Sequence, residues 1–585
     1  MSKQPSLFSH FRGDLFGGLT AGVVALPLAL AFGEQSGLGA SAGLYGAAFI
    51  GFFAAMLGGT ATQISGPTAP MTVLSAAIVT TIVTAKGGEV SDALPLILFV
   101  FLLAGAFQIG LGLMKAGSVI RFIPRTVVSG FMTGIGVIIL ITQVLPAVGY
   151  VAADDPDAVT AQLVQAEESL LHKALEAASM DDPLELEDLS SFNLSAQGIA
   201  AADIELEAQV LARNDAKGVL GTLRSLPHAI DGANFLELAL AVVTILIIYG
   251  FKRITTVIPS ALVALVGVTG AAIAMGLDYR PITPITSGLP SPHFDLFGSI
   301  EEALPFVFTA FLLSLLGGID SLLTSVVADN LTKTKHQPNK ELIGQGIGNG
   351  IAALFGGLPG AGATIRTVVN IQAGGRTRLS GMIAGALLFL TLMALGPIAS
   401  KIPTAVLSGI LITVGVGVMD YRGLRELKVM PWPDRIVLIT VLLLTVFWQL
   451  VYAVAVGLVL AALLFMRSMS RWSAGRFEVV RTEEEADGME GDRYVKHVRG
   501  PLFFGNVAEF GDLRTAIPAE ARKVEIDLTD VPFFDQSGVY ALEEAVLDLS
   551  IDGREVSILG LDTAQRSQLE AVRFIPNIVP AERVS

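Results

Sequence analysis

Long apolar segments alternate with short polar loops over most of the chain. Many of these segments approach the roughly 20 apolar residues that an α-helix needs to cross a bilayer. We therefore expect a polytopic α-helical membrane protein with fourteen transmembrane segments. They lie near residues 14–32, 42–57, 68–86, 94–114, 126–148, 235–250, 257–276, 304–328, 342–355, 364–373, 380–397, 403–419, 435–450 and 451–467.

Lysine and arginine are distributed unevenly among the loops. With the N-terminus placed inside, the loops on the same side carry most of the loop cations. The opposite loops hold only Lys86, Arg280 and Lys401, apart from those in one acidic insert. Because basic loops stay in the cytoplasm, this pattern predicts an even number of spans and two cytoplasmic termini. We expect the bilayer to be a bacterial-type inner (plasma) membrane.

The acidic insert at 151–232 interrupts the apolar pattern. From Asp154 to Arg224 it holds 15 acidic and 4 basic residues, which leaves an excess of 11 negative charges out of the chain's net −15. Helical periodicity at 159–179 and 199–215 predicts a small helical hairpin on the outer surface. No basic cluster is present, so we expect no nucleic-acid partner.

The last part of the chain has a different pattern. From residue 476 it is charged, and strand-like runs alternate with helix-like runs, which predicts a small βαβ-type domain. The strand-like runs are 494–504, 523–531 and 555–561, and the helix-like runs are 506–517, 537–553 and 563–574. We divide the chain into a cytoplasmic N-terminus (1–13), a transmembrane domain (14–475) and a cytoplasmic domain (476–585).

Composition narrows the possible functions. Hydrophobic residues make up 52% of the chain and charged residues 16%, and the 62 glycines are typical of helices that pack closely in lipid. Cysteine is absent, which excludes disulfides and thiolate metal sites. The sequence contains no nucleophile–base set and no metal-ligand cluster, so we expect neither an enzyme nor a resident cofactor.

A repeat relates the two halves of the transmembrane domain. AAMLGG at 54–59 precedes SGPTAP at 65–70, and AALFGG at 352–357 precedes GAGAT at 360–364. The two copies fall in the third and tenth segments, which lie seven spans apart and so run in opposite directions. Interrupted helices at matching places in inverted halves predict a substrate site near the bilayer midplane.

The second break has the features of an anion site. Residues 356–363 are half glycine, with one proline, and cannot form an ordinary helix, whereas 364–373 has the pattern of a short helix. A helix that begins at such a break directs unpaired N–H groups and a positive dipole end towards the cavity. Arg366 adds a fixed positive charge. The alternative explanation is a close helix crossing that needs small residues.

A carboxylate lies deep in the eighth segment. Asp320 is surrounded by apolar residues, and Thr324 follows four residues later on the same helical face. A carboxylate inside the membrane is costly and needs a partner. Together with Thr324 and carbonyls of the 358–363 break, Asp320 suits Na⁺, which takes oxygen ligands. Two other roles stay open, namely H⁺ coupling and a structural pairing with Arg366.

The motifs, in their order, resemble those of the SulP/SLC26 family of anion transporters. The resemblance covers nearly the whole chain, including a tail similar to a STAS domain at 526–538. Its other motifs are Asp14-Leu15-x-x-Gly18-x-Thr20, Leu26-Pro27, Gly43-Leu44-Tyr45-Gly46, Gly66-Pro67-Thr68 and Gly374-Gly375-Arg376-Thr377. The family implies two inverted repeats of seven spans, a core and a gate domain, a C-terminal STAS domain and a homodimer.

Within this family the chain is similar to the BicA-like Na⁺-dependent bicarbonate transporters. The similar stretches are 317–329, 339–349, 360–364 and 367–377. The resemblance implies a Na⁺ site at Asp320, Thr324, Gly362, Ala363 and Thr364. It implies an anion between the two half-helix ends, and the candidate residues are Thr68, Ala69, Ala363, Thr364 and Arg366.

Three residues depart from the family patterns. Arg366 stands where BicA-like carriers have a small residue, and it aligns with an arginine that lines the anion site of animal members. Leu28 occupies a position where many sulfate-type members have glutamine. Gln536 replaces the serine of phosphorylated STAS proteins, so we expect no phosphorylation switch there.

These observations lead to one expected function and two alternatives. We expect a secondary active transporter of a small inorganic oxyanion, namely bicarbonate driven by an inward Na⁺ gradient through alternating access. The first alternative is H⁺-coupled uptake of sulfate or a dicarboxylate. The second is an uncoupled anion exchanger or channel.

Overall fold

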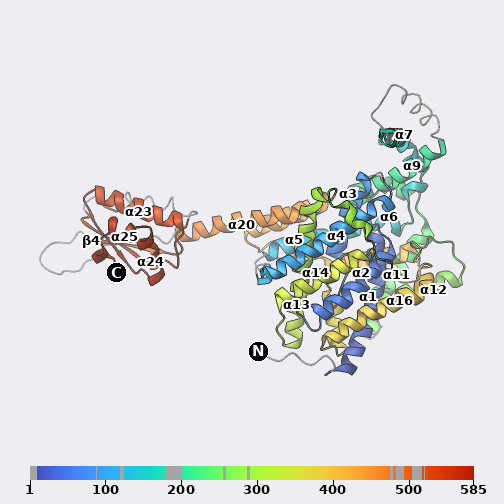
Figure 1. Ribbon diagram of the computed structural model, residues 1–585, viewed down its shortest axis with the longest axis horizontal. Helices are drawn as coiled ribbons and strands as arrows, with labels where there is room; N and C mark the ends of the chain where they lie inside the picture. Colours follow the sequence, from blue (N-terminus) through green and yellow to red (C-terminus); the bar gives the residue numbers. More distant parts are fainter. Residues whose placement is uncertain are drawn as a thin grey trace. The chain divides into compact units, whose positions relative to one another are not determined.

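The chain forms two compact units, Met1–Leu458, which is helical, and Val459–Ser585, which contains a β-sheet (Figure 1). The helix α20 (Leu450–Ala474) contains the boundary between them, and the predicted domain boundary at 475 follows its last residue. The computed structural model describes residues 9–86, 88–118, 124–179, 201–254, 259–285, 290–448, 450–474, 478–481, 493–503, 517–518 and 521–584.

Each predicted apolar segment coincides with helical structure. The segment at 126–148 divides into two helices, because α5 ends at Thr142 and the short α6 follows. The helices are α1 (Phe11–Ser36), α2 (Ala40–Leu57), α3 (Ala69–Ala85), α4 (Val90–Leu113), α5 (Arg125–Thr142), α6 (Val144–Ala147), α11 (Phe235–Ile254), α12 (Ser260–Ala274), α13 (Val307–Thr332), α14 (Pro338–Leu354), α15 (Thr364–Gln372), α16 (Arg378–Ala399), α17 (Thr404–Val418), α19 (Trp432–Phe447) and α20.

Helix length and apolarity support several membrane spans. Among the described residues, six helices are long and apolar enough to cross a bilayer, and five apolar helices are shorter. These six helices correspond to α1, α2, α4, α5, α11 and α13. The short ones include α3, which begins at a break and therefore covers only part of a bilayer's thickness. The count of fourteen spans stays a prediction.

The helices of the first unit pack into two groups. In one group, α14 contacts α2 and α4, while α16 contacts α1 and α2. In the other group, α5 contacts α17 and α19, and α11 contacts α12 and α17. The first group also contains α13 and α15, which contact each other. We name the first the core group and the second the gate group, after the two domains that the family resemblance implies.

A buried carboxylate joins the beginning of α1 to the beginning of α16. Asp14 is 0% exposed. Its Oδ1 accepts hydrogen bonds from the backbone N–H groups of Arg376 and Thr377, at 2.7 and 2.8 Å, and its Oδ2 accepts one from Thr377 Oγ1 at 2.6 Å. These contacts satisfy donors of the two residues that lead into α16, of which Thr377 is its N-cap.

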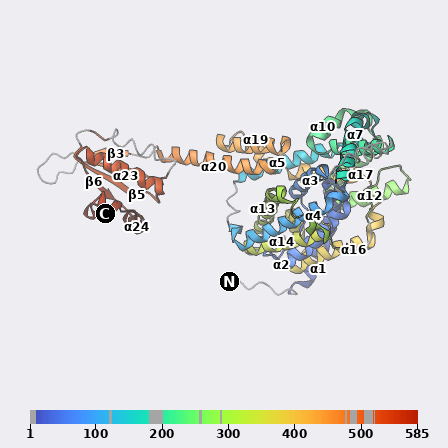
Figure 2. The same cartoon turned by 45° about the horizontal axis from the view of Figure 1, so that its top comes forward.

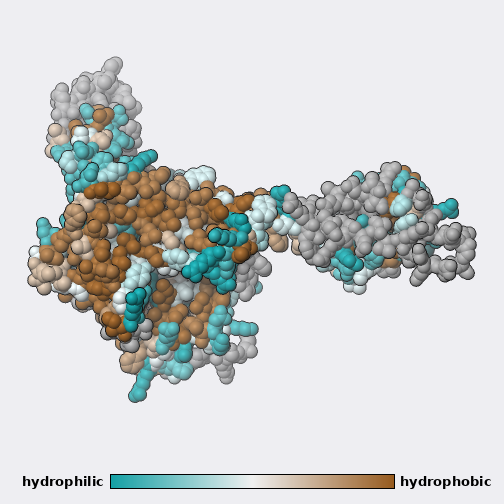
Figure 3. Space-filling view, turned by 180° about the vertical axis from the view of Figure 1, so that it is seen from behind, coloured by the Kyte–Doolittle hydropathy of each residue, from teal (hydrophilic) through white to brown (hydrophobic). Residues whose placement is uncertain are grey.

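Apolar side chains cover much of the surface of the helical unit. Figure 3 shows a broad hydrophobic face over this unit, with hydrophilic residues in separate patches. Large exposed apolar side chains on this surface include Leu246, Val266 and Leu390. A contiguous apolar surface of this size marks contact with lipid or protein, and together with the apolar helices it supports a multi-pass membrane protein.

The acidic insert contains a helical hairpin, as predicted, and one further helix. The hairpin consists of α7 (Pro156–Ser179) and α9 (Ala201–Asp215), which contact each other, and α10 (Gly218–Asp231) follows. All three contribute to one small apolar cluster with α6 and lie at one end of the helical unit (Figures 1 and 2). Sequence periodicity missed α10, whose interior contains Pro227.

The second unit has the predicted strand–helix alternation. Its sheet has the order β3-β4-β5-β6, in which β4 (Arg493–Arg499), β5 (Lys523–Asp530) and β6 (Glu555–Leu559) are parallel. The prediction missed β3 (Glu478–Arg481), which pairs antiparallel with β4. The helices α23 (Gln536–Ile551) and α24 (Thr563–Ala571) correspond to two predicted helices, and the third, at 506–517, lies outside the described residues except for residue 517.

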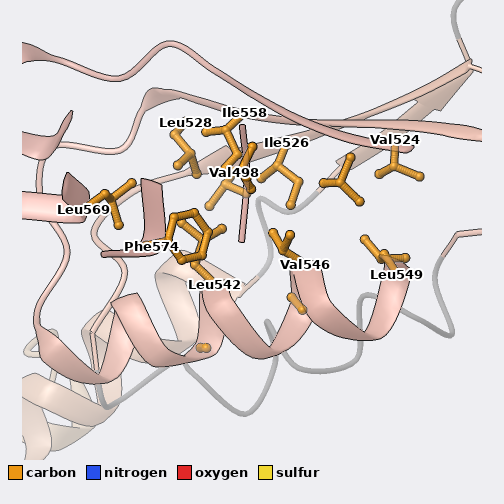
Figure 4. Close-up of a cluster of buried hydrophobic side chains, with 14 of the residues drawn as sticks. Val498, Val524, Ile526, Leu528, Leu542, Val546, Leu549, Ile558, Leu569 and Phe574 are labelled. Carbon is orange, nitrogen blue, oxygen red and sulfur yellow. The ribbon is translucent and has the colours of Figure 1, made fainter. Parts of the chain in front are cut away.

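One helix covers a face of this sheet. Along β5 the buried residues alternate with more exposed ones, as expected for a strand with one buried face. Figure 4 shows Leu542 and Val546 of α23 pointing towards the strands that carry Ile526 and Ile558. All four side chains are fully buried in one apolar cluster. The second unit therefore has a hydrophobic core of its own.

Candidate functional site

The two helix breaks lie side by side in the core group. Two short strands, β1 (Ser65–Gly66) and β2 (Ala361–Gly362), pair in antiparallel fashion, with Ser65 opposite Gly362 and Gly66 opposite Ala361. The strands belong to the two copies of the sequence repeat. The sequence prediction that the copies form facing breaks is therefore confirmed by their direct pairing.

Glycine is required where the two backbones meet. A Cβ atom added to Gly360 would lie 2.2 Å from the backbone carbon and oxygen of Gly66, closer than any real contact. Asn349 holds the same glycine, because its Oδ1 accepts from Gly360 N at 2.8 Å and its Nδ2 donates to Gly360 O at 3.0 Å. The Gly-rich sequence of the second break therefore allows a backbone contact that no other residue would permit.

A short helix begins at each break. Thr68 precedes α3, and Ala363 precedes α15, both in extended backbone conformations. The first intrahelical hydrogen bonds run from Thr72 N to Thr68 O and from Thr367 N to Ala363 O. The N–H groups before them have no acceptor within their own helices. Each break therefore presents a helix N-terminus, which favours a negatively charged ligand.

Arg366 lies within the first turn of α15 and is 2% exposed. One guanidinium nitrogen, Nη2, donates a hydrogen bond to Pro67 O in the opposite break. The other, Nη1, has no hydrogen-bond partner and lies beside Gly66, where an added Cβ would be 2.9 Å away. A buried cationic donor without a partner adds to the preference of this region for an anion.

Asp320 also contacts the first break. Thr68 Oγ1 donates a hydrogen bond of 2.9 Å to Asp320 Oδ2, which joins α13 to the beginning of α3. No hydrogen bond or ion pair joins Asp320 to Arg366, although the two charges are close enough to attract each other through space. Their structural pairing, one of the three roles considered from the sequence, therefore stays open.

Oxygen atoms converge one helical turn beyond Asp320. Thr324 Oγ1 donates to Gly362 O at 2.9 Å and lies 2.7 Å from Thr364 Oγ1. Since Asp320 and Thr324 are four residues apart on α13, a carboxylate, two hydroxyls and a carbonyl are available on one side of the second break. These are hard, partly or fully negative oxygen ligands, which suit a monovalent cation such as Na⁺.

Besides Gly362, two predicted site residues have no polar side chain and offer backbone groups only. Ala69 is the first residue of α3, and Ala363 is the last residue before α15. Ala363 N donates to Ile64 O at 2.8 Å, so this N–H is used in the contact between the breaks. The ligand roles predicted for these residues stay predictions.

The sequence reasoning missed a set of buried polar side chains around the breaks. Glu341, Gln345 and Asn349 occur every four residues on α14 and form one buried polar face. The i, i+4, i+8 spacing in the stretch at 339–349 was the signal that could have revealed them. Asn370 adds a hydrogen bond from its Nδ2 to Thr62 O at 2.8 Å.

The arrangement is that of a helical membrane transporter with discontinuous helices at its centre. Two helix N-termini and one buried guanidinium can bind an anion, while neighbouring oxygens can bind a cation. Ligands of opposite charge at adjacent positions favour each other's binding through Coulomb attraction, which is strong where water is excluded. The site can therefore couple an anion to a cation without any covalent chemistry.

Comparisons with known proteins agree with this class. The model of the sulfate permease family matches residues 11–180 and 195–441, and that of the STAS domain matches residues 484–584. The bicarbonate transporter BicA of Synechocystis sp. is 37% identical over 589 residues, which cover 97% of this chain and 92% of that protein. The chain therefore belongs to the sulfate permease family, whose members are transporters.

Solved structures agree with the fold. The transmembrane domain of a cyanobacterial bicarbonate transporter, BicA, matches with a TM-score of 0.60 and 38% identity, over 78% of this chain and 98% of that one. SLC26A9 matches with a TM-score of 0.76 over 99% of this chain and 89% of that one. Because the two sequences are only 18% identical, this match is evidence for the fold alone.

Proposed function

We propose that this protein takes up bicarbonate into the cell with Na⁺ as the coupling ion. The observation that carries the proposal is the convergence of Thr324, Gly362 and Thr364 one helical turn from Asp320, beside two facing helix N-termini. Similarity to bicarbonate transporters along nearly the whole chain supports the anion. The cation is inferred from the ligand chemistry of the site.

The proposed mechanism begins with the cation. Na⁺ bound at Asp320 and Thr324 would offset the carboxylate charge and connect α13 to the start of α15. Bicarbonate would then bind between Thr68 and Ala363, within reach of the helix ends and Arg366. The loaded core group would move against the gate group, and the site would open to the other side of the membrane.

A second candidate function is H⁺-coupled uptake of sulfate or a dicarboxylate. The buried guanidinium of Arg366, with one unpartnered nitrogen, favours it, because a fixed charge and a second donor suit a divalent anion. In that mechanism a proton at Asp320 would take the place of Na⁺. An uncoupled exchanger or channel is the third candidate.

The membrane setting completes the proposal. We place the protein in a bacterial-type inner membrane with both termini and the STAS domain in the cytoplasm, following the distribution of loop cations. We also propose a homodimer as the functional assembly. Crosslinking of the protein in native membranes would test the dimer, and accessibility of single introduced cysteines would test the orientation, since the chain contains no other cysteine.

Uptake by purified protein in proteoliposomes tests the proposed function. Labelled bicarbonate and labelled sulfate are offered separately, with an inward Na⁺ gradient, an inward H⁺ gradient or no gradient. Bicarbonate uptake that requires the Na⁺ gradient is the expected result. Sulfate uptake that follows the H⁺ gradient and ignores Na⁺ would select the second candidate instead.

Replacement of Arg366 tests its part in anion binding. We expect Arg366→Lys to raise the KM for bicarbonate about tenfold, because the single ammonium nitrogen of lysine cannot occupy the positions of both Nη2 and Nη1. The measurement is uptake as a function of bicarbonate concentration at saturating Na⁺. Arg376→Lys is the matched control, since that side chain is exposed. An unchanged KM in the Arg366 variant would remove this residue from the anion site.

A further inference from the structure

Glu341 is a buried carboxylate outside the proposed ion site. It lies in the first turn of α14 and is 1% exposed. Its Oε2 accepts from Gly59 N and Thr60 N, both at 2.8 Å, and its Oε1 accepts from Gln63 Nε2 at 2.8 Å and Gln345 Nε2 at 2.9 Å. All four donors are neutral, and no residue in the described part of the chain forms an ion pair with Glu341.

Burial of this carboxylate costs free energy, and its four hydrogen bonds require a specific geometry. Four donors match an ionised carboxylate, which only accepts hydrogen bonds. Burying a charge without a countercharge costs free energy, which four charge-assisted hydrogen bonds partly offset. Hydrophobic packing would hold α14 in place at lower cost. The geometry therefore points to a role for Glu341 beyond packing.

The two side-chain amides bound to Glu341 contact different elements, because one reaches β1 and the other reaches α13. Gln345 Nε2 also donates to Ser65 Oγ at 2.5 Å, so it holds β1. Gln63 Oε1 accepts from Ser325 Oγ at 2.9 Å, so it holds α13 at the residue after Thr324. One carboxylate thus fixes the orientation of two amides, each of which contacts an element of the proposed ion site.

A third contact links Gln63 to the second break. The side-chain amide of Gln63 lies directly against Gly362, where an added Cβ would be 2.3 Å from Nε2. Gly362 N donates to Ser321 Oγ on α13 at 3.0 Å, and Gly362 O accepts from Thr324. The carbonyl that we assign to the cation is therefore held between α13 and an amide whose orientation Glu341 determines.

We propose that Glu341 is a positioning residue that fixes the relative placement of β1, β2 and α13, and thereby the affinity of the site for its ions. The proposal rests on the proposed function only in taking this site as the place where the ions bind. Glu341 contacts neither ion. It acts through Gln63 and Gln345, which are the two donors to its Oε1.

Glu341→Gln tests this role with little change in shape. The glutamine side chain has an NH2 group where Glu341 has its second oxygen, and this group would face N–H donors on either side. At least one amide or backbone donor therefore loses its acceptor. We expect the KM for both Na⁺ and bicarbonate to rise about tenfold, while the maximal rate per folded transporter changes less than about threefold. The measurements are uptake in proteoliposomes and the folded fraction by size-exclusion chromatography.

An exchange of the two residues provides the rescue. In Glu341→Gln/Gln63→Glu, the new glutamine can accept from Gly59 N and Thr60 N and donate to the new carboxylate, which can still accept from Ser325. Gln345 Nε2 then keeps only its bond to Ser65. We expect this double variant to recover part of the parent affinity, namely the part that depends on Gln63. Lys340→Gln, at an exposed neighbouring position, is the matched control and should keep the parent KM.

Other outcomes would overturn the proposal. A folded Glu341→Gln protein with the parent KM would show that Glu341 only stabilises the fold. If Glu341→Gln does not fold, Gln345→Ala takes its place, because it keeps the carboxylate and removes the connection from Glu341 through Gln345 to Ser65. An unchanged KM there would equally contradict the proposal. The proposed function is decided separately by the ion dependence of the parent protein, since the ratio of variant to parent KM is measured for whichever ions it transports.

Discussion

Replacement of Asp320 by asparagine is expected to abolish cation-driven uptake. Asparagine keeps the shape of the side chain, and its Oδ1 can still accept the hydrogen bond from Thr68 Oγ1. It cannot offset the charge of a bound Na⁺ or take up a transported proton. Loss of one member of a buried charge pair costs ~3–5 kcal/mol, which corresponds to about a hundredfold or more in affinity. The measurement is the ratio of uptake with and without the cation gradient.

The control for this experiment is Asp434→Asn, an exposed acidic position in the first turn of α19. It should keep the parent ratio. Cation-independent uptake that survives in Asp320→Asn would favour uncoupled exchange. Retention of the full cation stimulation by a folded Asp320→Asn protein would place the coupling site elsewhere in the molecule.

Gly360→Ala is expected to abolish transport of both ions. The added methyl group would lie 2.2 Å from the Gly66 backbone, so the paired strands β1 and β2 must separate. Neither backbone segment can move easily, because Asn349 is hydrogen-bonded to Gly360 and the rigid Pro67 follows Gly66. We expect a loss of stability of at least ~3 kcal/mol and uptake reduced to background. Thermal unfolding in detergent and proteoliposome uptake measure the two effects.

Gly417→Ala is the matched control for Gly360→Ala. Gly417 lies within α17, and an added Cβ there would meet no atom within 4 Å. Alanine at such a helical position should stabilise the protein by ~0.5–1 kcal/mol and leave transport intact. Uptake at the parent rate by Gly360→Ala would mean that the strands need not be in close contact for transport.

Sequence patterns revealed those parts of the site that contrast with their surroundings. Asp320 stands out because a carboxylate in an apolar segment is rare. The two breaks stand out because glycine and proline interrupt helical periodicity in both copies of the repeat. The repeat also predicted that the breaks would face each other, and the structure pairs Ser65 with Gly362.

The partners of these residues could not be predicted in the same way. The bond from Arg366 to Pro67 O joins residues 299 positions apart, and nothing in the local sequence of either residue specifies the other. Glu341 follows Lys340 and lies just before the predicted span at 342–355, where a charged residue is usually solvated. Its burial depends on tertiary packing against residues 59–63, which local patterns do not encode.

The bonds from Asp14 to the two residues that precede α16 have a consequence for the order of events during synthesis. Asp14 and Arg376 are 362 positions apart. At ~5–20 residues per second, the first helix waits about 20–70 seconds before its partner has been made. During that time the Asp14 carboxylate cannot receive the three bonds that it accepts in the finished protein. The packing of α1 against α16 in the core group therefore forms only after α16 has been synthesised. A chain that stops before α16 leaves a charged residue of its first helix without its native partners.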